Sequence, residues 1–353
     1  MINLGIIGCG RIVEEAHIHA LIELKKLFRV VALADPSSQQ LEKIAAMLEK
    51  AKLPRPALYT DYRKMLKTEK SLTTVDMALP HHLHHEGVMA AAAAGLNVFT
   101  EKPLAVNLKQ ADAMIAAMKR AKRSLIIFHN YLYIPAIARA LELVRDGAIG
   151  KVFLIRNEGL GGGHWPGTAS YDPAWRTKSA KAGGGCLLDN GYHHLYLCRE
   201  FMGAKASQVY AVTRTYTRPI TVDDTAVLLL SYKNGGTACV QTAWSIQGGA
   251  GYIHEIQGTG GTISFSQINP ATGQMAPLAL YTPKTAKWTF PSLGKRHGNP
   301  FTGFLADWGA KLDQWLAKGM KGAPPTNAPD ARRNLETIEM AYKSSKAGKA
   351  IKL

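Results

Sequence analysis

The sequence predicts an α/β domain followed by an α+β domain. The chain has 353 residues, more than a single hydrophobic core usually supports. Strand-like and helix-like patterns alternate in its first part, as in a doubly wound parallel sheet. In the later part, strand-like segments follow one another across glycine turns, as in antiparallel sheets. We therefore expect a Rossmann domain over residues 1–125 and, over residues 126–353, a mainly antiparallel, open-faced sheet with helices.

Five apolar runs predict the parallel strands of the first domain, because strands that are buried on both faces are continuously apolar. Between these runs apolar residues recur at helical spacing, and Asn107 and Gly95 suit a helix N-cap and C-cap. The expected strands cover residues 3–8, 28–35, 71–80, 97–101 and 124–130. The expected helices cover residues 12–27, 40–52, 84–95 and a segment that starts after Asn107.

Six strand-like segments predict the second sheet. The turns "KNGG" and "GTGG" separate several of them, as in β-hairpins. Helices are expected near 135–146, from Phe301 to Leu316, where apolar residues share one face, and from Pro329 on. The expected strands cover residues 151–159, 207–217, 225–233, 236–245, 251–258 and 261–267.

The chain is strongly basic, with 43 Lys and Arg against 26 Asp and Glu, a formal net charge of +17. The excess is spread over both predicted domains, and no nucleic-acid-binding motif accompanies it. We therefore expect a generally basic surface without specific nucleic-acid binding. An anionic substrate or partner is the alternative interpretation.

Cysteine usage and hydropathy bear on the compartment. The four cysteines form no C-x-x-C pair and are scattered along the chain, which is typical of reduced thiols. No apolar stretch is long enough to cross a membrane, and the N-terminus lacks the features of a signal peptide. These features predict a cytoplasmic protein without a membrane partner.

The segment "GIIGCGRIV" places Gly8 and Gly10 between a strand and a helix, as a dinucleotide-binding turn requires. The helix N-terminus would then face the pyrophosphate. Val13 stands where the fingerprint has its third glycine, so the motif is imperfect. Asp35 ends the second strand, where a carboxylate binds ribose hydroxyls and repels a 2′-phosphate, which favours NAD over NADP. The alternative for Asp35 is a helix N-cap.

Two polar segments carry the residues that we assign to catalysis. "TEKPLA" places Lys102 after the fourth strand, where a lysine can stabilise alkoxide charge or relay a proton. "GGGCLLDNGYHH" holds Asp189 and His193 four residues apart, so a helix would turn both toward one pocket. A histidine suits general-base work on an alcohol, and a carboxylate can orient the histidine or the substrate. The alternatives are a surface salt bridge for the lysine, and a helix-terminal acid and a buried histidine for the other two.

Together with the glycine turn and "PHHLH", these segments resemble the Gfo/Idh/MocA oxidoreductase family over nearly the whole chain. The resemblance implies that Lys102 lies near the nicotinamide and the reacting hydroxyl, and that Asp189 and His193 are the catalytic pair. It also implies a cis peptide bond before Pro103. The expected cofactor contacts are Gly8, Gly10, Arg11, Ile12, Asp35, Pro80, His81, Glu101, Lys102 and Asn130.

The substrate side departs from the family pattern. Family members often carry an acid three residues after the catalytic histidine, where this chain has Tyr196, and the adjacent His194 is also unusual. Residues 159–176 are rich in glycine and aromatic residues, which suits a carbohydrate ligand; a surface loop anchored by two tryptophans is an equal alternative. The expected substrate contacts are Trp165, Trp175, Arg176 and His194.

The run "PHHLHHE" at residues 80–86 holds four histidines. By the resemblance, His81 contacts the cofactor and His84 serves packing and hydrogen bonding, whereas His82 and His85 face solvent. His81 and His85 are spaced as two zinc ligands can be, but no third ligand is evident nearby. We expect no metal.

The leading hypothesis is an NAD-dependent oxidoreductase that transfers a hydride between nicotinamide and a secondary hydroxyl of a sugar, cyclitol or related polyol. In this hypothesis, His193 takes the hydroxyl proton, and Lys102 stabilises the negative charge that develops on that oxygen. Asp189 positions the substrate or His193. The alternatives are an NAD-dependent glycoside-cleaving enzyme that oxidises its sugar transiently, and a non-catalytic cofactor-sensing regulator. The sheet edges and open face predict a homodimer or homotetramer.

Overall fold

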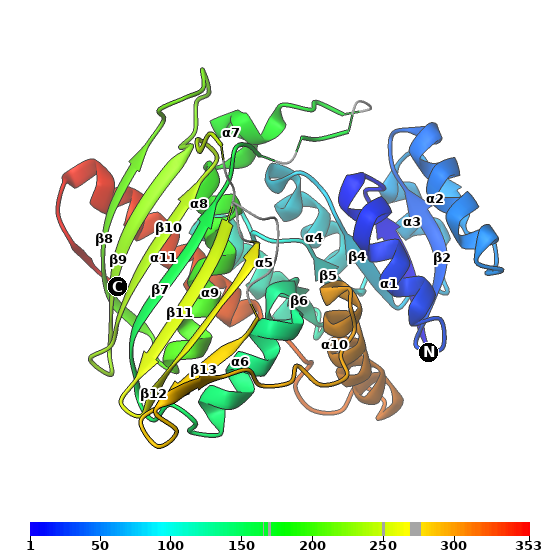
Figure 1. Ribbon diagram of the computed structural model, residues 1–353. Coiled ribbons are helices and arrows are strands. Elements are labelled where there is room, and N and C mark those ends of the chain that lie inside the picture. The colour runs from blue at the N-terminus through cyan, green and yellow to red at the C-terminus, as the bar shows by residue number, and fades with distance from the viewer. Residues whose placement is uncertain (165, 169–170, 249–250, 269–276) are drawn as a thin grey trace.

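The computed structural model describes residues 1–164, 166–168, 171–248, 251–268 and 277–353. It contains two sheets, each with its own helices, that lie side by side (Figure 1). The predicted fold class is confirmed, because a parallel Rossmann-type sheet is followed by a mainly antiparallel one. The predicted domain boundary at residue 125 stays a prediction; strand β6 (Leu125–Ile127) pairs with the first sheet.

The first sheet has six parallel strands in the order β3-β2-β1-β4-β5-β6. Sequence analysis missed β3, because a three-residue edge strand leaves no apolar run to detect. The order reverses between β1 and β4, and ligands of open α/β sheets bind beyond the strand ends at such a point. The strands are β1 (Ile2–Ile7), β2 (Phe28–Ala34), β3 (Ala57–Tyr59), β4 (Thr74–Met77), β5 (Asn97–Thr100) and β6.

Alternate residues of these strands enter two apolar clusters, one on each face of the sheet. The first predicted helix begins with a π-helical turn at Val13–His17 and ends at Glu23, earlier than expected. The side chains of Ser37 and Asn107 cap α2 and α5 by accepting hydrogen bonds from main-chain N–H groups. The helices are α1 (Ile18–Glu23), α2 (Ser38–Lys50), α3 (Tyr62–Thr68), α4 (His84–Ala93) and α5 (Leu108–Arg120).

The second sheet has nine strands in the order β14-β13-β12-β11-β7-β10-β9-β8-β15. All neighbouring pairs are antiparallel except β7 and β10. The three strands that were not predicted, β13, β14 and β15, are short; β14 and β15 are the two edge strands, and β13 lies next to β14. The strands are β7 (Val152–Leu160), β8 (Ala206–Arg214), β9 (Thr225–Tyr232), β10 (Thr237–Ala243), β11 (Gly251–Gly258), β12 (Gly261–Ile268), β13 (Ala279–Thr282), β14 (Lys287–Thr289) and β15 (Ile351–Lys352).

Helices α8, α9 and α11 pack against one face of this sheet (Figure 1). The opposite face carries two groups of apolar side chains, one on β8 and β9 and the other on β13 and β14, and several of them are exposed. They are Tyr210, Val227, Leu229, Tyr281 and Trp288. The helices of this part are α6 (Pro135–Arg145), α7 (Ser179–Ala182), α8 (Cys186–Asp189), α9 (Gly191–Met202) and α11 (Ala328–Ala347).

One helix from the late part of the chain packs against the first domain instead. Helix α10 (Pro300–Ala317) follows the second sheet in sequence but lies beside α1 (Figure 1). Its residue Phe304 contacts Phe99 of β5 and Phe128, with ring centroids 6.5 and 4.8 Å apart. The apolar face predicted for this helix thus completes the core on one side of the parallel sheet.

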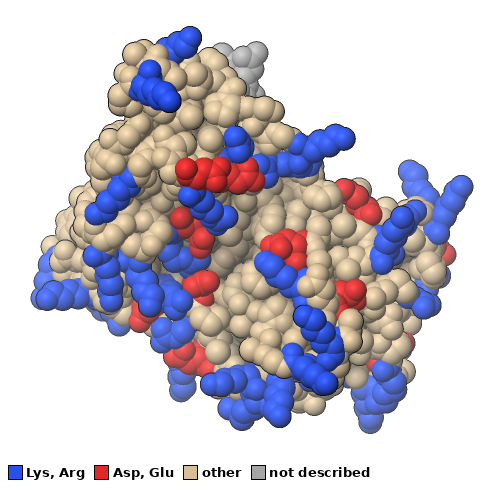
Figure 2. All heavy atoms as spheres, turned by 90° about the horizontal axis from the view of Figure 1, so that it is seen from below, with Lys and Arg blue, Asp and Glu red and all other residues tan. Residues whose placement is uncertain are grey.

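Basic side chains are spread over the face shown in Figure 2, with acidic side chains among them. On this face the picture agrees with the expectation of a generally basic surface. Within the described part of the chain, no helix is both long and apolar enough to span a bilayer.

Two buried histidines of the second domain are kept neutral by the fold. His254 is 1% exposed and stacks on Phe265, and His194 is fully buried on α9. Burial lowers the pKa of His254 to about 3 and that of His194 to about 4. Neither ring nitrogen of His254 has a hydrogen-bond partner among the described residues.

We expect the free energy of unfolding to fall as the pH drops from about 6.5 toward 4. In that window the unfolded chain protonates both histidines while the folded chain does not, so protons favour unfolding. His254→Phe removes one of these groups and should make the decline shallower. Urea unfolding at pH 7.5 and 5 measures the effect, with the exposed His19→Gln as control. Equal slopes for His254→Phe and the wild type would contradict the prediction.

Candidate active site

A cavity of about 650 Å³ lies between the two domains. It brings together residues from the strand ends of the parallel sheet and from α8 and α9. All ten residues predicted to contact the cofactor line it, as do Asp189, His193, Trp175 and Arg176. His194 does not: it follows His193 on the helix and points instead to Asn157 of β7, 2.7 Å away. Trp165 lies outside the described residues.

The glycine turn closes one end of the cavity. Gly8 has a φ of +89°, and a Cβ there would lie 2.5 Å from the carbonyl oxygen of Ala78, so only glycine fits. Gly10 lies at the cavity wall and accepts the N–H of Val13 at the first turn of the helix. Val13 itself is fully buried in the core, where it takes the place of the missing third glycine. This cradle suits a pyrophosphate.

Asp35 is held beside the same turn. Its carboxylate accepts hydrogen bonds from the main-chain N–H groups of Cys9 and Ser37, both 2.8 Å away. Ser37, not Asp35, caps the helix that follows, so the alternative interpretation of Asp35 as the N-cap is wrong. The acid therefore stands at the end of β2 on the cavity wall, where a ribose would lie.

Lys102 and Asp189 form an ion pair across the domain boundary. The Lys102 ammonium donates to the Asp189 carboxylate and, at 3.1 Å, to the Asp189 main-chain oxygen. The guanidinium of Arg176 lies 3.5 Å from the other carboxylate oxygen. Burial alone would raise the pKa of Asp189, but the charges of Lys102 and Arg176 lower it below its ordinary value. The carboxylate therefore stays ionised and fixes both cations. The peptide bond before Pro103 is cis, as the resemblance implied.

His193 sits at the start of α9 and is packed by two tyrosines. The Tyr131 ring stacks on it with centroids 3.8 Å apart, and the Tyr196 hydroxyl lies 2.8 Å from its Nδ1. Burial, together with the nearby charge of Lys102, lowers the pKa of His193 well below its ordinary value. The partner of Nδ1 is thus Tyr196, which stands where members of the family that the sequence resembles often carry an acid.

The structure also shows a buried triad that sequence reasoning missed. His17 is fully buried, and its two ring nitrogens lie 2.9 Å from Asp76 and 3.0 Å from Glu101. Burial alone would lower the pKa of His17, but the two carboxylates raise it to about 10. Both nitrogens therefore donate, and the ring is a cation. Glu101 in turn accepts the main-chain N–H of Lys102, so the triad supports the lysine turn.

The histidine run is divided between cavity and core. His81 lines the cavity, and its Nδ1 lies 3.0 Å from the main-chain oxygen of Ala182. His84 is fully buried between two carbonyl oxygens, which confirms its role in hydrogen bonding and packing. His82 and His85 are partly exposed. The described residues contain no group of three histidines, cysteines or acids arranged to hold a metal ion.

Residues of the glycine-rich loop reach the cavity as well. Trp175 is buried with its ring nearly perpendicular to that of His81, and the Arg176 guanidinium lies over the Trp175 ring. Several other aromatic or polar lining residues were not among the expected contacts, although Tyr171 belongs to the segment 159–176 that the sequence marks as rich in glycine and aromatic residues. They are Tyr131, Tyr171, Asn190 and Tyr252.

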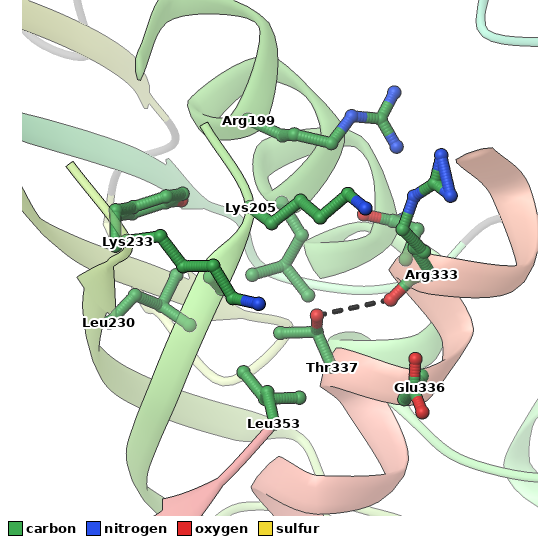
Figure 3. Close-up of a pocket in the computed structure, with 12 residues that line it drawn as sticks. Arg199, Lys205, Leu230, Lys233, Arg333, Glu336, Thr337 and Leu353 are labelled. Carbon is green, nitrogen blue, oxygen red and sulfur yellow. Dashed lines mark hydrogen bonds between the residues drawn. The ribbon is translucent and has the colours of Figure 1, made fainter. Parts of the chain in front are cut away.

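A second cavity of about 230 Å³ lies between α9, α11 and strands β8 and β9 (Figure 3). It shares no lining residue with the large cavity. Basic side chains border it, and two of them, Arg199 and Arg333, pair with Glu200 and Asp330. The chemistry-bearing residues belong to the large cavity, so we place the candidate active site there.

Comparisons with known proteins agree with this geometry. Residues 2–129 match the model of an oxidoreductase family with an NAD-binding Rossmann fold, and residues 137–264 match the GFO/IDH/MocA C-terminal domain. The levoglucosan dehydrogenase of Pseudarthrobacter phenanthrenivorans is 28% identical over 68% of this chain and 70% of its own. The D-apiose dehydrogenase of Paraburkholderia graminis is 27% identical over 99% and 88%. The aldose-aldose oxidoreductase of Caulobacter crescentus, 24% identical, shares the fold with a TM-score of 0.81 over 100% and 99%.

We expect His17→Gln to lower the free energy of unfolding by about 3 kcal/mol at pH 7, because it leaves a buried carboxylate without its cation. The difference from the wild type should shrink as the pH rises from about 6.5 to about 10, because in that window the unfolded chain has lost the His17 proton while the folded chain still holds it. Urea unfolding across this range measures it. His19→Gln, two residues away and exposed, is the control, and equal losses in both variants would refute the triad's role.

Proposed function

Because the chain belongs to the GFO/IDH/MocA oxidoreductase family, we propose that it oxidises or reduces a sugar, cyclitol or related polyol with NAD. The reaction transfers a hydride between nicotinamide and a secondary hydroxyl carbon. One observation carries the proposal: the glycine turn, Asp35, Lys102, Asp189 and His193 all line one cavity. The named relatives act on sugars, which supports the substrate class.

The residues of the cavity fit a dinucleotide. Gly8 and Gly10 leave room for the pyrophosphate, and Asp35 would accept hydrogen bonds from the ribose hydroxyls. Lys102 and His193 would bind the reacting oxygen. One of them would exchange the proton of the substrate hydroxyl, and the other would donate a hydrogen bond to the oxygen. Asp189 would hold the Lys102 ammonium in place, which refines the predicted role of positioning the substrate or His193. When bound, NAD supplies the hydride acceptor.

A screen of sugars, polyols and their keto forms with NAD or NADH, followed at the NADH absorbance, tests the function. His193→Ala should lower turnover on any substrate found by about 10²–10⁴, because it removes a group that contacts the reacting oxygen. His19→Gln should keep full turnover. Turnover of His193→Ala at the wild-type rate would exclude His193 from the chemistry.

We expect NAD to bind more tightly than NADP, because the Asp35 carboxylate repels a 2′-phosphate. Asp35→Ser should weaken NAD binding by roughly tenfold, the cost of a lost hydrogen bond to a charged group. It should also reduce the preference for NAD over NADP. Fluorescence titration with both cofactors measures it. Tighter binding of NADP by the wild type would overturn the assignment.

We also propose that the chain forms a homodimer or homotetramer through the open face of its second sheet. The apolar side chains on that face support it, among them Leu229, which is 51% exposed. Leu229→Glu should dissociate the assembly in light scattering, whereas Gln39→Glu on the exposed side of α2 should not. A monomeric wild type would contradict the proposal.

We keep a cytoplasmic location as part of the proposal. All four cysteines are free thiols, which supports a reducing compartment. Fractionation of cells that produce the protein tests it.

A further inference from the structure

The hydroxyl of Tyr196 contacts one ring nitrogen of His193. Tyr196 is fully buried on α9, one turn after the histidine. Its oxygen accepts the main-chain N–H of Tyr131 at 3.1 Å and lies 2.8 Å from the Nδ1 of His193. These are the two hydrogen bonds of this hydroxyl among the described residues.

Counting hydrogens decides which atom donates. The Tyr131 N–H already donates to the hydroxyl oxygen, so the single hydroxyl hydrogen needs an acceptor, and Nδ1 is the one within reach. If Nδ1 carried a proton, it would face the hydroxyl as a second donor, and the hydroxyl hydrogen would be buried without an acceptor. Such an unsatisfied donor costs about 1–3 kcal/mol. The neutral ring therefore carries its proton on Nε2.

We propose that Tyr196 is a positioning residue that holds neutral His193 as the Nε2–H tautomer, so that His193 donates a hydrogen bond to the reacting oxygen and Lys102 exchanges the proton. This rests on the proposed function and reverses the proton role that the sequence suggested for His193. In the reducing direction, the carbonyl carbon receives the hydride and the carbonyl π pair moves to oxygen. The Lys102 ammonium gives that oxygen a proton and is reprotonated from solvent. In the oxidising direction, Lys102 must first be neutral.

The surroundings of His193 favour a neutral ring. The titratable groups that face it are Lys102 and Asp189 from the two domains, Tyr131 and His129 after β6, and Tyr196 and His194 on its own helix. Of these only Asp189 is an anion, and it is already paired with Lys102 and Arg176. Burial and the charge of Lys102 both oppose protonation of His193. A ring that stays neutral acts through its tautomer, which makes the tyrosine contact decisive.

The tautomer can be observed directly, without cofactor or substrate. We would label the cofactor-free protein with ¹⁵N-histidine and identify the His193 signals by difference from His193→Gln. The proposal requires a protonated Nε2 and an unprotonated Nδ1 in the wild type. Tyr196→Phe should lose this preference. Tyr192→Phe, the same change one turn earlier on α9, should keep it, because that hydroxyl points to Ala331 and His129. A protonated Nδ1 in the wild type would overturn the proposal.

Kinetics provide the second measurement, on any substrate that the screen finds. Glutamine keeps an N–H donor near the position of Nε2 but cannot exchange a proton. If His193 is a donor, His193→Gln should retain activity about tenfold or more above His193→Ala. If His193 exchanges the proton, the two variants should be equally slow, which would refute the proposal. If the wild type turns over none of the compounds, the proposed function is refuted. The tautomer measurement, which needs no substrate, still tests the role of Tyr196.

Discussion

The ion pair between Lys102 and Asp189 is the contact on which the rest of the site depends. It joins the lysine turn after β5 to the end of α8, and so fixes the two domains to each other at the floor of the cavity. Each partner has its own support. His17 and Glu101 hold the lysine turn from the first domain. Asp223 accepts the N–H groups of Gly185 and Leu187 at the start of α8, in the second. The pair is thus backed on both sides by buried hydrogen bonds, as a precise catalytic geometry requires.

The charge of each buried histidine depends on the groups that its ring contacts. His17 meets two carboxylates and is a cation, whereas His254 meets an aromatic ring and is neutral. His193 and His194 are neighbours in sequence, yet one faces the cavity and the other faces β7, because successive residues of a helix point about 100° apart. The same residue type is therefore a buried cation, a core side chain and a cavity-lining side chain within one chain.

Local sequence determined most of the site, and long-range contacts determined what sequence analysis missed. Gly8, Asp35 and Lys102 could be found because each belongs to a short segment with a strand before it. The triad could not be found, because Asp76 and Glu101 follow His17 by 59 and 84 residues. Only the order of β1, β4 and β5 in the sheet brings the three side chains together. The prediction of His194 as a substrate contact failed because the segment holds two adjacent histidines. Only the register of the helix determines that His193, and not His194, faces the cavity. The strands β3, β13, β14 and β15 are too short and too exposed to leave an apolar signature.

Helix α10 has a consequence for how the protein is made. It covers the aromatic residues Phe99 and Phe128 of the parallel sheet, and Gly309 lets it approach Phe28 of β2 so closely that a Cβ would lie 2.5 Å from that ring. A ribosome therefore completes all six strands of the parallel sheet long before it synthesises the helix that covers them. During that interval the nascent sheet exposes its phenylalanines. The order of synthesis thus leaves this apolar face of the sheet without its cover until Ala317, the last residue of α10, has left the exit tunnel.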